Sequence, residues 1–141
     1  MSFEHGEVTG TVIGAAIAVH NELGPGFLES TYEKSLVVEL GARGMPLAQQ
    51  VGVTVAYRGT EVAVHRIDLL VAGQIIVELK AIRTVPDVHV AIVRSYLRAA
   101  RLTHALLLNF GNERLEIKRI RSRPIPSQIS LSSPTSLARG R

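Results

Sequence analysis

Cysteine is absent from the 141-residue chain. Its absence excludes disulfides, thiolate zinc sites and cysteine nucleophiles, so any bound metal must be held by oxygen or imidazole ligands. Long apolar runs are missing too, since no stretch reaches the roughly 18 residues that a membrane-spanning helix needs. The first seven residues also lack the basic and apolar pattern of a secretory signal. We therefore expect a cytoplasmic protein without a membrane partner.

Lysine is scarce, with three residues, and arginine supplies most of the net charge of +4. Arginine suits phosphate recognition because its planar guanidinium donates two parallel hydrogen bonds. The excess is modest, however, and three of the arginines come after Arg121. The charge therefore permits a nucleic-acid partner without requiring one.

The remaining composition is that of a folded domain, with 46% hydrophobic and 20% charged residues. A chain of this length fits one hydrophobic core, and we expect a single domain over residues 1–121. Residues 122–141 contain three prolines and six serines but few large apolar side chains. That composition is typical of a disordered tail.

Apolar residues recur at helical spacing in three segments, which predict helices over residues 8–23, 28–43 and 87–101. The first two helices are separated by the corner Gly24-Pro25-Gly26, where proline removes a donor and glycine permits positive φ. Together with the strands described next, the three helices predict a fold of the α/β class, more closely α+β.

Segments rich in Val and Ile predict three consecutive antiparallel strands at residues 51–57, 61–71 and 74–81. Two further strands, 104–110 and 113–120, are predicted to be joined by a two-residue turn at Gly111-Asn112. The predicted order of elements is ααβββαββ.

Three charged residues on two neighbouring strands are the candidates for chemistry. Residues two apart on a strand project from the same face, so Glu78 and Lys80 emerge side by side. Asp68 lies on the preceding strand and can stand opposite Glu78. A two-residue loop would pair Asp68 with Val77 and separate the carboxylates, whereas a three-residue loop, 72–74, or a bulge would bring them together. The metal-site hypothesis therefore requires the odd loop.

Two converging acids are costly to bury without a counter-ion. A hard cation such as Mg²⁺ relieves the repulsion while keeping waters, one of which can attack a phosphate. Lys80 would orient or deprotonate that water and offset charge on the phosphate. Glu29, seven residues before Leu36 on the second helix, is expected to point toward the core and to hold a further water or ion. The alternative is a salt-bridge cluster without catalysis.

Short motifs between residues 20 and 120 carry a family resemblance. Gly26, Glu29 and Tyr32, within the run from Leu23 to Glu33, resemble the signature of the bacterial GxxExxY family, a branch of the PD-(D/E)XK nuclease superfamily. The likeness continues, in order and at family spacing, through residues 66–71, 77–81, 89, 96–97 and 109–111.

This resemblance implies a restriction-endonuclease-like core, with a central mixed sheet of about five strands flanked by helices. It implies that Asp68, Glu78 and the Leu79 carbonyl are ligands of Mg²⁺ or Mn²⁺. Lys80 would be the catalytic base or electrostatic partner, and Glu29 the acid supplied by the helix.

Three further residues are candidates for substrate contact. Arg66 lies two residues before Asp68 on the same predicted strand face, within reach of a phosphate near the metal. The resemblance places His89 and Tyr96 near the site. Nuclease relatives commonly carry Gln four residues before this tyrosine, and here that position is Ile92.

Two functions from different classes remain open. The first is a Mg²⁺- or Mn²⁺-dependent nuclease that acts on DNA in preference to RNA. The second is a weak or inactive nuclease-fold module that binds nucleic acid or assembles into a homo-oligomer, and Ile92 and exposed strand edges favour it. Arg94, Arg98 and Arg101 form a basic stripe on the third predicted helix. Such a stripe is usually solvated, and as a phosphate track it would make binding strongly salt-dependent.

Overall fold

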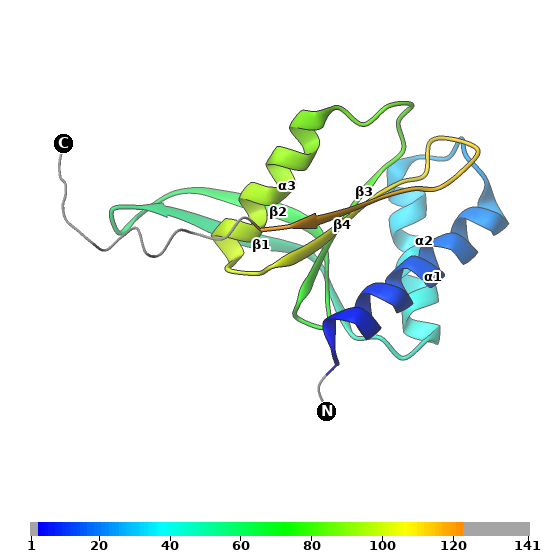
Figure 1. Ribbon diagram of the computed structural model, residues 1–141, viewed down its shortest axis with the longest axis horizontal. Helices are drawn as coiled ribbons and strands as arrows, with labels where there is room; N and C mark the ends of the chain where they lie inside the picture. The colour runs from blue at the N-terminus through cyan, green and yellow to red at the C-terminus, as the bar shows by residue number, and fades with distance from the viewer. Residues whose placement is uncertain (1–2, 123–141) are drawn as a thin grey trace.

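The computed structural model describes residues 3–122, and the observed order of elements is the predicted ααβββαββ (Figure 1). The helices are α1 (His5–Leu23), α2 (Glu29–Ala42) and α3 (Asp87–Ala100). The strands are β1 (Leu47–Tyr57), β2 (Thr60–Val71), β3 (Ile75–Lys80), β4 (His104–Asn109) and β5 (Glu116–Arg121). Apart from Ser122, the predicted disordered tail lies outside the described residues. None of the described helices has the length and apolar character needed to cross a membrane.

The five strands form one mixed sheet in the order β1-β2-β3-β4-β5. Neighbouring strands are antiparallel except for β3 and β4, which are parallel. Parallel neighbours cannot be joined by a tight turn, and α3 makes the crossover between them. The expected mixed sheet of five strands flanked by helices is therefore confirmed.

The helices lie on opposite faces of the sheet, with α1 and α2 on one side and α3 on the other (Figure 1). Alternation along β3 separates the two cores: Ile75, Val77 and Leu79 pack with α1 and α2, whereas Ile76 packs under α3. Because Glu78 lies two residues after Ile76, it belongs to the α3 side of the strand.

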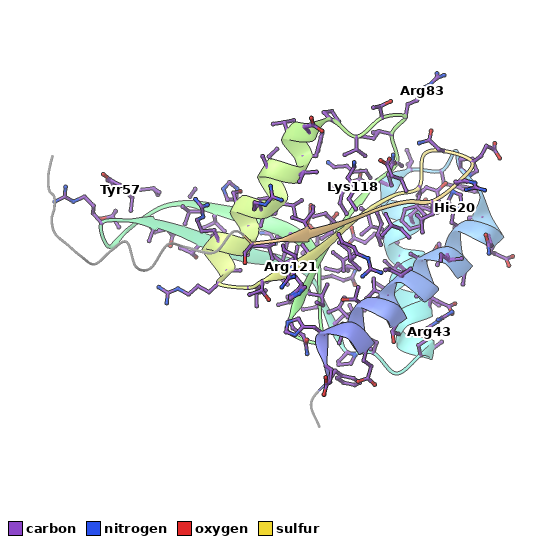
Figure 2. All side chains as sticks on the ribbon, in the orientation of Figure 1. His20, Arg43, Tyr57, Arg83, Lys118 and Arg121 are labelled. Carbon is purple, nitrogen blue, oxygen red and sulfur yellow. The ribbon has the colours of Figure 1, made fainter. Side chains whose placement is uncertain are left out.

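The strands β1 and β2 form a hairpin, called here the arm, that extends well beyond the rest of the sheet (Figure 1). Tyr57 lies near its tip, away from α1 and α2 (Figure 2). The turn places Arg58 at φ 51° and Gly59 at φ 81°, and consecutive positive φ values match the right-handed twist of the paired strands. The arm gives the molecule an exposed surface beside α3.

Tyr32 fixes the corner before α2 and is itself fully buried. Its hydroxyl donates to the Gly24 carbonyl at 2.5 Å and accepts from the Phe27 N–H at 3.2 Å. Its ring stacks on Phe110, with 4.6 Å between the centroids. Tyr32 therefore sets where α2 begins, and through it the position of Glu29.

The predicted two-residue turn at Gly111-Asn112 is wrong. Asn109 pairs with Glu116 at the ends of β4 and β5, so residues 110–115 form a longer loop. The side chain of Asn109 accepts from the N–H groups of Ile82 and Gly111, at 3.0 and 3.1 Å, and binds the loop before α3. A Cβ at Gly111 would collide with the Ile82 backbone. This tertiary contact, which local sequence does not encode, overrides the turn signal.

His20 braces the same loop from α1, since its Nε2 lies 2.9 Å from the Asn112 carbonyl. Figure 2 shows His20 at the end of α1 beside this loop. The histidine is buried and serves the fold.

Candidate active site

The loop between β2 and β3 has three residues. Val71 pairs with Ile75 and Leu69 with Val77, and the loop is closed by a bond from the Gln74 N–H to the Val71 carbonyl at 3.0 Å. Counting on by one residue from Leu69 and Val77 sets Asp68 opposite Glu78. The odd loop that the metal-site hypothesis requires is therefore present.

The two carboxylates replace backbone bonds between the strands. Glu78 Oε2 accepts from the Asp68 N–H at 2.8 Å, and Asp68 Oδ2 accepts from the Leu79 N–H at 2.9 Å. The regular ladder between β2 and β3 ends at Leu69 and Val77. No pair of β2 and β3 residues is in register beyond that point. We call this end of the ladder, where the two acids lie, the opening between β2 and β3. The odd loop was expected to bring the acids together, whereas nothing in the sequence indicates these reciprocal bonds.

Both acids resist ionisation in this position. Burial, followed by the neighbouring charge of Asp68, raises the pKa of Glu78 to about 8. Burial also raises the pKa of Asp68, and the bond from Leu79 opposes that rise. Among residues 3–122, ion pairs join Glu39 to Arg43 and Glu116 to Lys118, and none reaches these acids. When either acid ionises, no side chain in direct contact therefore neutralises its charge.

Lys80 lies close enough to act on the acids through its charge. It is half-buried, and its charge works to lower the pKa of Glu78, of Asp68 and of Glu29. Its carbonyl accepts from the Phe110 N–H at 2.8 Å, which directs that carbonyl toward β4. In a strand the N–H and C=O of one residue point to the same side and successive residues alternate. The Leu79 carbonyl therefore faces β2, as its N–H does.

Glu29 does not point into the core, and that expectation is wrong. It is the first residue of α2 and is exposed, whereas the buried stripe of the helix begins at Tyr32 and continues through Leu36. A helical repeat predicts burial only where the helix is covered. Partial desolvation nevertheless raises the pKa of Glu29, and the charges of Lys80 and Asp68 act on it. Glu29 thus lies within electrostatic range of the opening, at a helix N-terminus that favours negative charge.

Glu33 and Gln50 also lie near Asp68, and neither was among the residues predicted from the sequence. Glu33 follows Glu29 by one helical turn, and its charge raises the pKa of Asp68. The Gln50 amide donates to both oxygens of Glu33, at 3.2 and 3.0 Å, and works to lower the pKa of Asp68. The spacing of Glu29 and Glu33 was a usable signal for the first residue. No sequence signal marks Gln50.

The backbone of Gln50 is in an unusual conformation for a strand, with φ 52°. It sits on β1 between the pairs Gln49 to Leu69 and Val51 to Ile67, and so lies opposite Asp68. Arg66, a predicted substrate-binding residue, donates from Nη1 to the Gln50 carbonyl at 3.0 Å. Arg66 is exposed and braces this irregular point of β1.

Tyr96 reaches the site from α3. Burial and then the charges of Glu78 and Asp68 raise the pKa of its hydroxyl. Its ring lies 5.3 Å from the ring of His65 on β2. His89, in the first turn of α3, is half-buried, and no contact ties it to the acids. Ile92, one turn before Tyr96, is 39% exposed.

The described residues contain no group of three His, Cys, Asp or Glu side chains arranged to hold a metal ion. Asp68 and Glu78 meet as a pair. Mg²⁺ commonly binds through one or two carboxylates and keeps several waters, so two acids suit that ion better than a site built entirely from protein ligands.

Comparison with known proteins agrees with this fold. Residues 6–120 match the family model of the PD-(D/E)XK nuclease superfamily. A solved structure, described as the crystal structure of SSO0001, superposes with a TM-score of 0.50 at 15% identity, covering 86% of this chain and 69% of that one. No curated protein matches. Since the family model spans most of the chain, the protein belongs to the PD-(D/E)XK nuclease superfamily.

Proposed function

We propose that the protein hydrolyses phosphodiester bonds in nucleic acid with the help of Mg²⁺ or Mn²⁺ at the opening between β2 and β3. The observation that carries the proposal is the meeting of Asp68 and Glu78 without a cation in direct contact. A structural ion-pair cluster would neutralise these charges, whereas a cation site needs them available. Superfamily membership supports the same reaction class.

Asp68, Glu78 and the Leu79 carbonyl would hold the cation. The carboxylates bond to backbone N–H groups through Oδ2 and Oε2, and each carboxylate has a second oxygen to offer. These bonds also fix the orientation of both groups, so the donor set is organised before any ion arrives. The cation would supply Lewis-acid activation of the scissile phosphate and of the attacking water.

Lys80 and Glu29 would act on the substrate side of the site. Because Lys80 lies beside the acids without pairing with them, its ammonium group is available to orient the attacking water and to stabilise negative charge on the phosphate. Glu29, with its raised pKa, would accept a hydrogen bond from that water or exchange a proton with it. Tyr96 would contact the substrate from α3.

Within the superfamily we place the protein in the GxxExxY branch. Support comes from what the signature residues do here: Tyr32 fixes the corner containing Gly24 and Phe27, and this corner delivers Glu29 to the site. DNA in preference to RNA as substrate, self-association and a cytoplasmic location remain predictions.

Ile92 favours a second candidate function, a module that binds nucleic acid without cleaving it. Its partly exposed side chain stands one helical turn from Tyr96, and it offers no hydrogen bond to a substrate or water. Such a module would keep the fold and lose turnover.

The test is a cleavage assay of the purified full chain on single- and double-stranded DNA and RNA, with Mg²⁺, with Mn²⁺ or with EDTA. Cleavage should require metal and should be lost in Asp68→Asn and Lys80→Ala. Asparagine can still accept the Leu79 N–H, so Asp68→Asn removes charge with little change in structure. Glu39→Gln, which removes an acid paired to Arg43, is the matched control and should cleave normally. Cleavage that survives both site variants would refute the proposal, and binding without cleavage would favour the module.

A further inference from the structure

A basic groove runs between α3 and the arm. It has a volume of about 540 Å³, and residues from three elements line it. They include Thr54 and Ala56 of β1, His65 of β2, and Ser95, Arg98 and Arg101 from α3 and its C-terminal cap. None of the described residues that line this groove is acidic, so the two guanidinium groups set its charge.

Arg98 also borders a smaller depression of about 220 Å³ that Arg94 and Ser95 line. Arg94 is already engaged, since its Nε donates to the Arg121 carbonyl at 3.1 Å. Arg98 and Arg101 are both exposed, and the ion pairs within residues 3–122 include neither. These two arginines are therefore the ones able to bind an anion in the groove.

Arg101 occupies a position where stability favours another residue. It caps α3 in the left-handed conformation, at φ 59° and ψ 39°. Glycine, and less often asparagine, normally takes this position because a side chain there strains the backbone. An arginine at this position lowers helix stability relative to glycine, and its guanidinium group lines the groove.

One residue in the groove wall contacts a residue that lies near the acids. His65, in its wall, lies 5.3 Å from the ring of Tyr96. Tyr96 in turn feels the charges of Glu78 and Asp68. The basic lining, the arginine at positive φ and the contact from His65 to Tyr96 together distinguish this surface from an ordinary solvated helix face.

We propose that the groove between α3 and the arm binds the phosphodiester backbone of the substrate strand beyond the scissile phosphate, with Arg98 and Arg101 each contacting a phosphate. This assignment rests on the proposed nuclease function. DNA and RNA share the backbone chemistry, and single strands of both serve as probes.

The experiment measures binding of labelled single-stranded DNA and RNA of the same sequence to the full chain in EDTA, by fluorescence anisotropy over a range of salt concentrations. The variants are Arg98→Gln, Arg101→Gly and the two combined. Each lost contact with a single strand should reduce the slope of log K against log salt by about 0.7 and weaken binding several-fold. Arg101→Gly should keep or raise the melting temperature, which separates lost binding from lost folding.

Arg119→Gln is the matched control. Arg119 is exposed on β5, and alternation places it on the face away from Ile120, which packs under α3. This variant removes the same charge and should leave the slope nearly unchanged. Equal losses in Arg119→Gln, or unchanged slopes in the groove variants, would overturn the proposal, as would absence of binding by the unmodified chain.

Binding measured in EDTA tests the groove, and cleavage measured with metal tests the nuclease function, so the two proposals can fail separately. Binding that depends on Arg98 and Arg101, without cleavage under any metal, would sustain the groove and refute the nuclease. Cleavage whose KM is the same in the groove variants would sustain the nuclease and refute the groove. DNA and RNA that bind equally would support recognition through phosphates. Tighter binding of DNA or of RNA would still support the groove proposal if the salt slope falls in both arginine variants. It would also show whether the protein distinguishes deoxyribose from ribose.

Discussion

Asn109 on β4 and the acid pair on β2 and β3 lie in neighbouring parts of the sheet, and they differ in how well their hydrogen-bonding groups and charges are satisfied. Asn109, the partner of Lys80 in the register, is fully buried. Its oxygen accepts from the N–H groups of Ile82 and Gly111, and its amide donates to the Ile82 carbonyl and to Glu116. It is neutral and makes bonds with both ends of its amide.

Asp68 on β2 and Glu78 on β3 are acids with raised pKa values and, among the described residues, no cation in direct contact. Burying such groups costs stability, whereas burying a satisfied amide does not. We therefore propose that Asn109 serves the fold and that the acid pair serves function. Four predictions test this division.

The largest effect is expected from Glu78→Gln. Glutamine can still accept the Asp68 N–H, but it removes the charge that would hold the cation. Metal-dependent cleavage should fall by about a thousandfold or more, about 4 kcal/mol of transition-state stabilisation. Melting temperature in EDTA should stay the same or rise, because a buried ionisable acid has been replaced. A variant that cleaves normally would show that Glu78 is structural.

The opposite pattern is expected from Asn109→Ala. It leaves the backbone groups of Ile82 and Gly111 buried without partners, and the free energy of unfolding should fall by about 3 to 5 kcal/mol. The control is Asn112→Ala, which removes an exposed amide-to-carbonyl bond to Arg83 and should cost less than about 1 kcal/mol. Urea unfolding measures both. Equal losses of unfolding free energy in Asn109→Ala and Asn112→Ala would show that Asn109 has no special role in the fold.

Stability without metal should depend on pH through Glu78. Its pKa in the folded protein, about 8, lies above the ordinary 4.5. Between these values the folded protein keeps a proton that the unfolded chain releases, so stability falls as pH rises from about 4.5 to about 8. The slope reaches at most about 1.4 kcal/mol per pH unit. Melting curves in EDTA measure it. Glu78→Gln should make the curve shallower, and a flat curve in the unmodified chain would contradict the raised pKa of Glu78.

The smallest effect is expected at Gln50, which holds Glu33 and faces Asp68. Gln50→Gly relieves the positive φ and should stabilise the fold by up to about 1 kcal/mol. The lost amide should nevertheless weaken Mn²⁺ binding about tenfold. Gln50→Asn, which tolerates the backbone but has a shorter side chain, separates the two effects. Unchanged Mn²⁺ affinity in both variants would exclude Gln50 from the site.

The pattern of apolar residues predicted the order of elements, because that order follows from local periodicity. It named Asp68 and Glu78 as a pair that meets only if the loop between their strands is odd. It left the loop length after Val71 open, since the apolar residues of β3 fit either register. Positive φ values at Ala72 and Gly73 settle the loop. Alanine gives no local signal for that conformation.

The features that the sequence did not predict depend on contacts between segments that are distant along the chain. Glu29 was predicted to face the core because a helical repeat contains no information about where the sheet stops covering α2. The turn at Gly111 was predicted from two residues, whereas its path depends on Ile82. Gln50 has a role only because Glu33 and Asp68 lie beside it in three dimensions. Pairings of this kind cannot be read from periodicity.

Calorimetric titration of the full chain with Mn²⁺ tests the central claim most directly. The unmodified protein should bind Mn²⁺ with a saturable isotherm, and binding should be lost when Asp68→Asn and Glu78→Gln are combined. Glu39→Gln should bind as the unmodified chain does. Absence of Mn²⁺ binding by the unmodified protein, or equal binding by the combined variant, would contradict the assignment of these two acids to a metal centre.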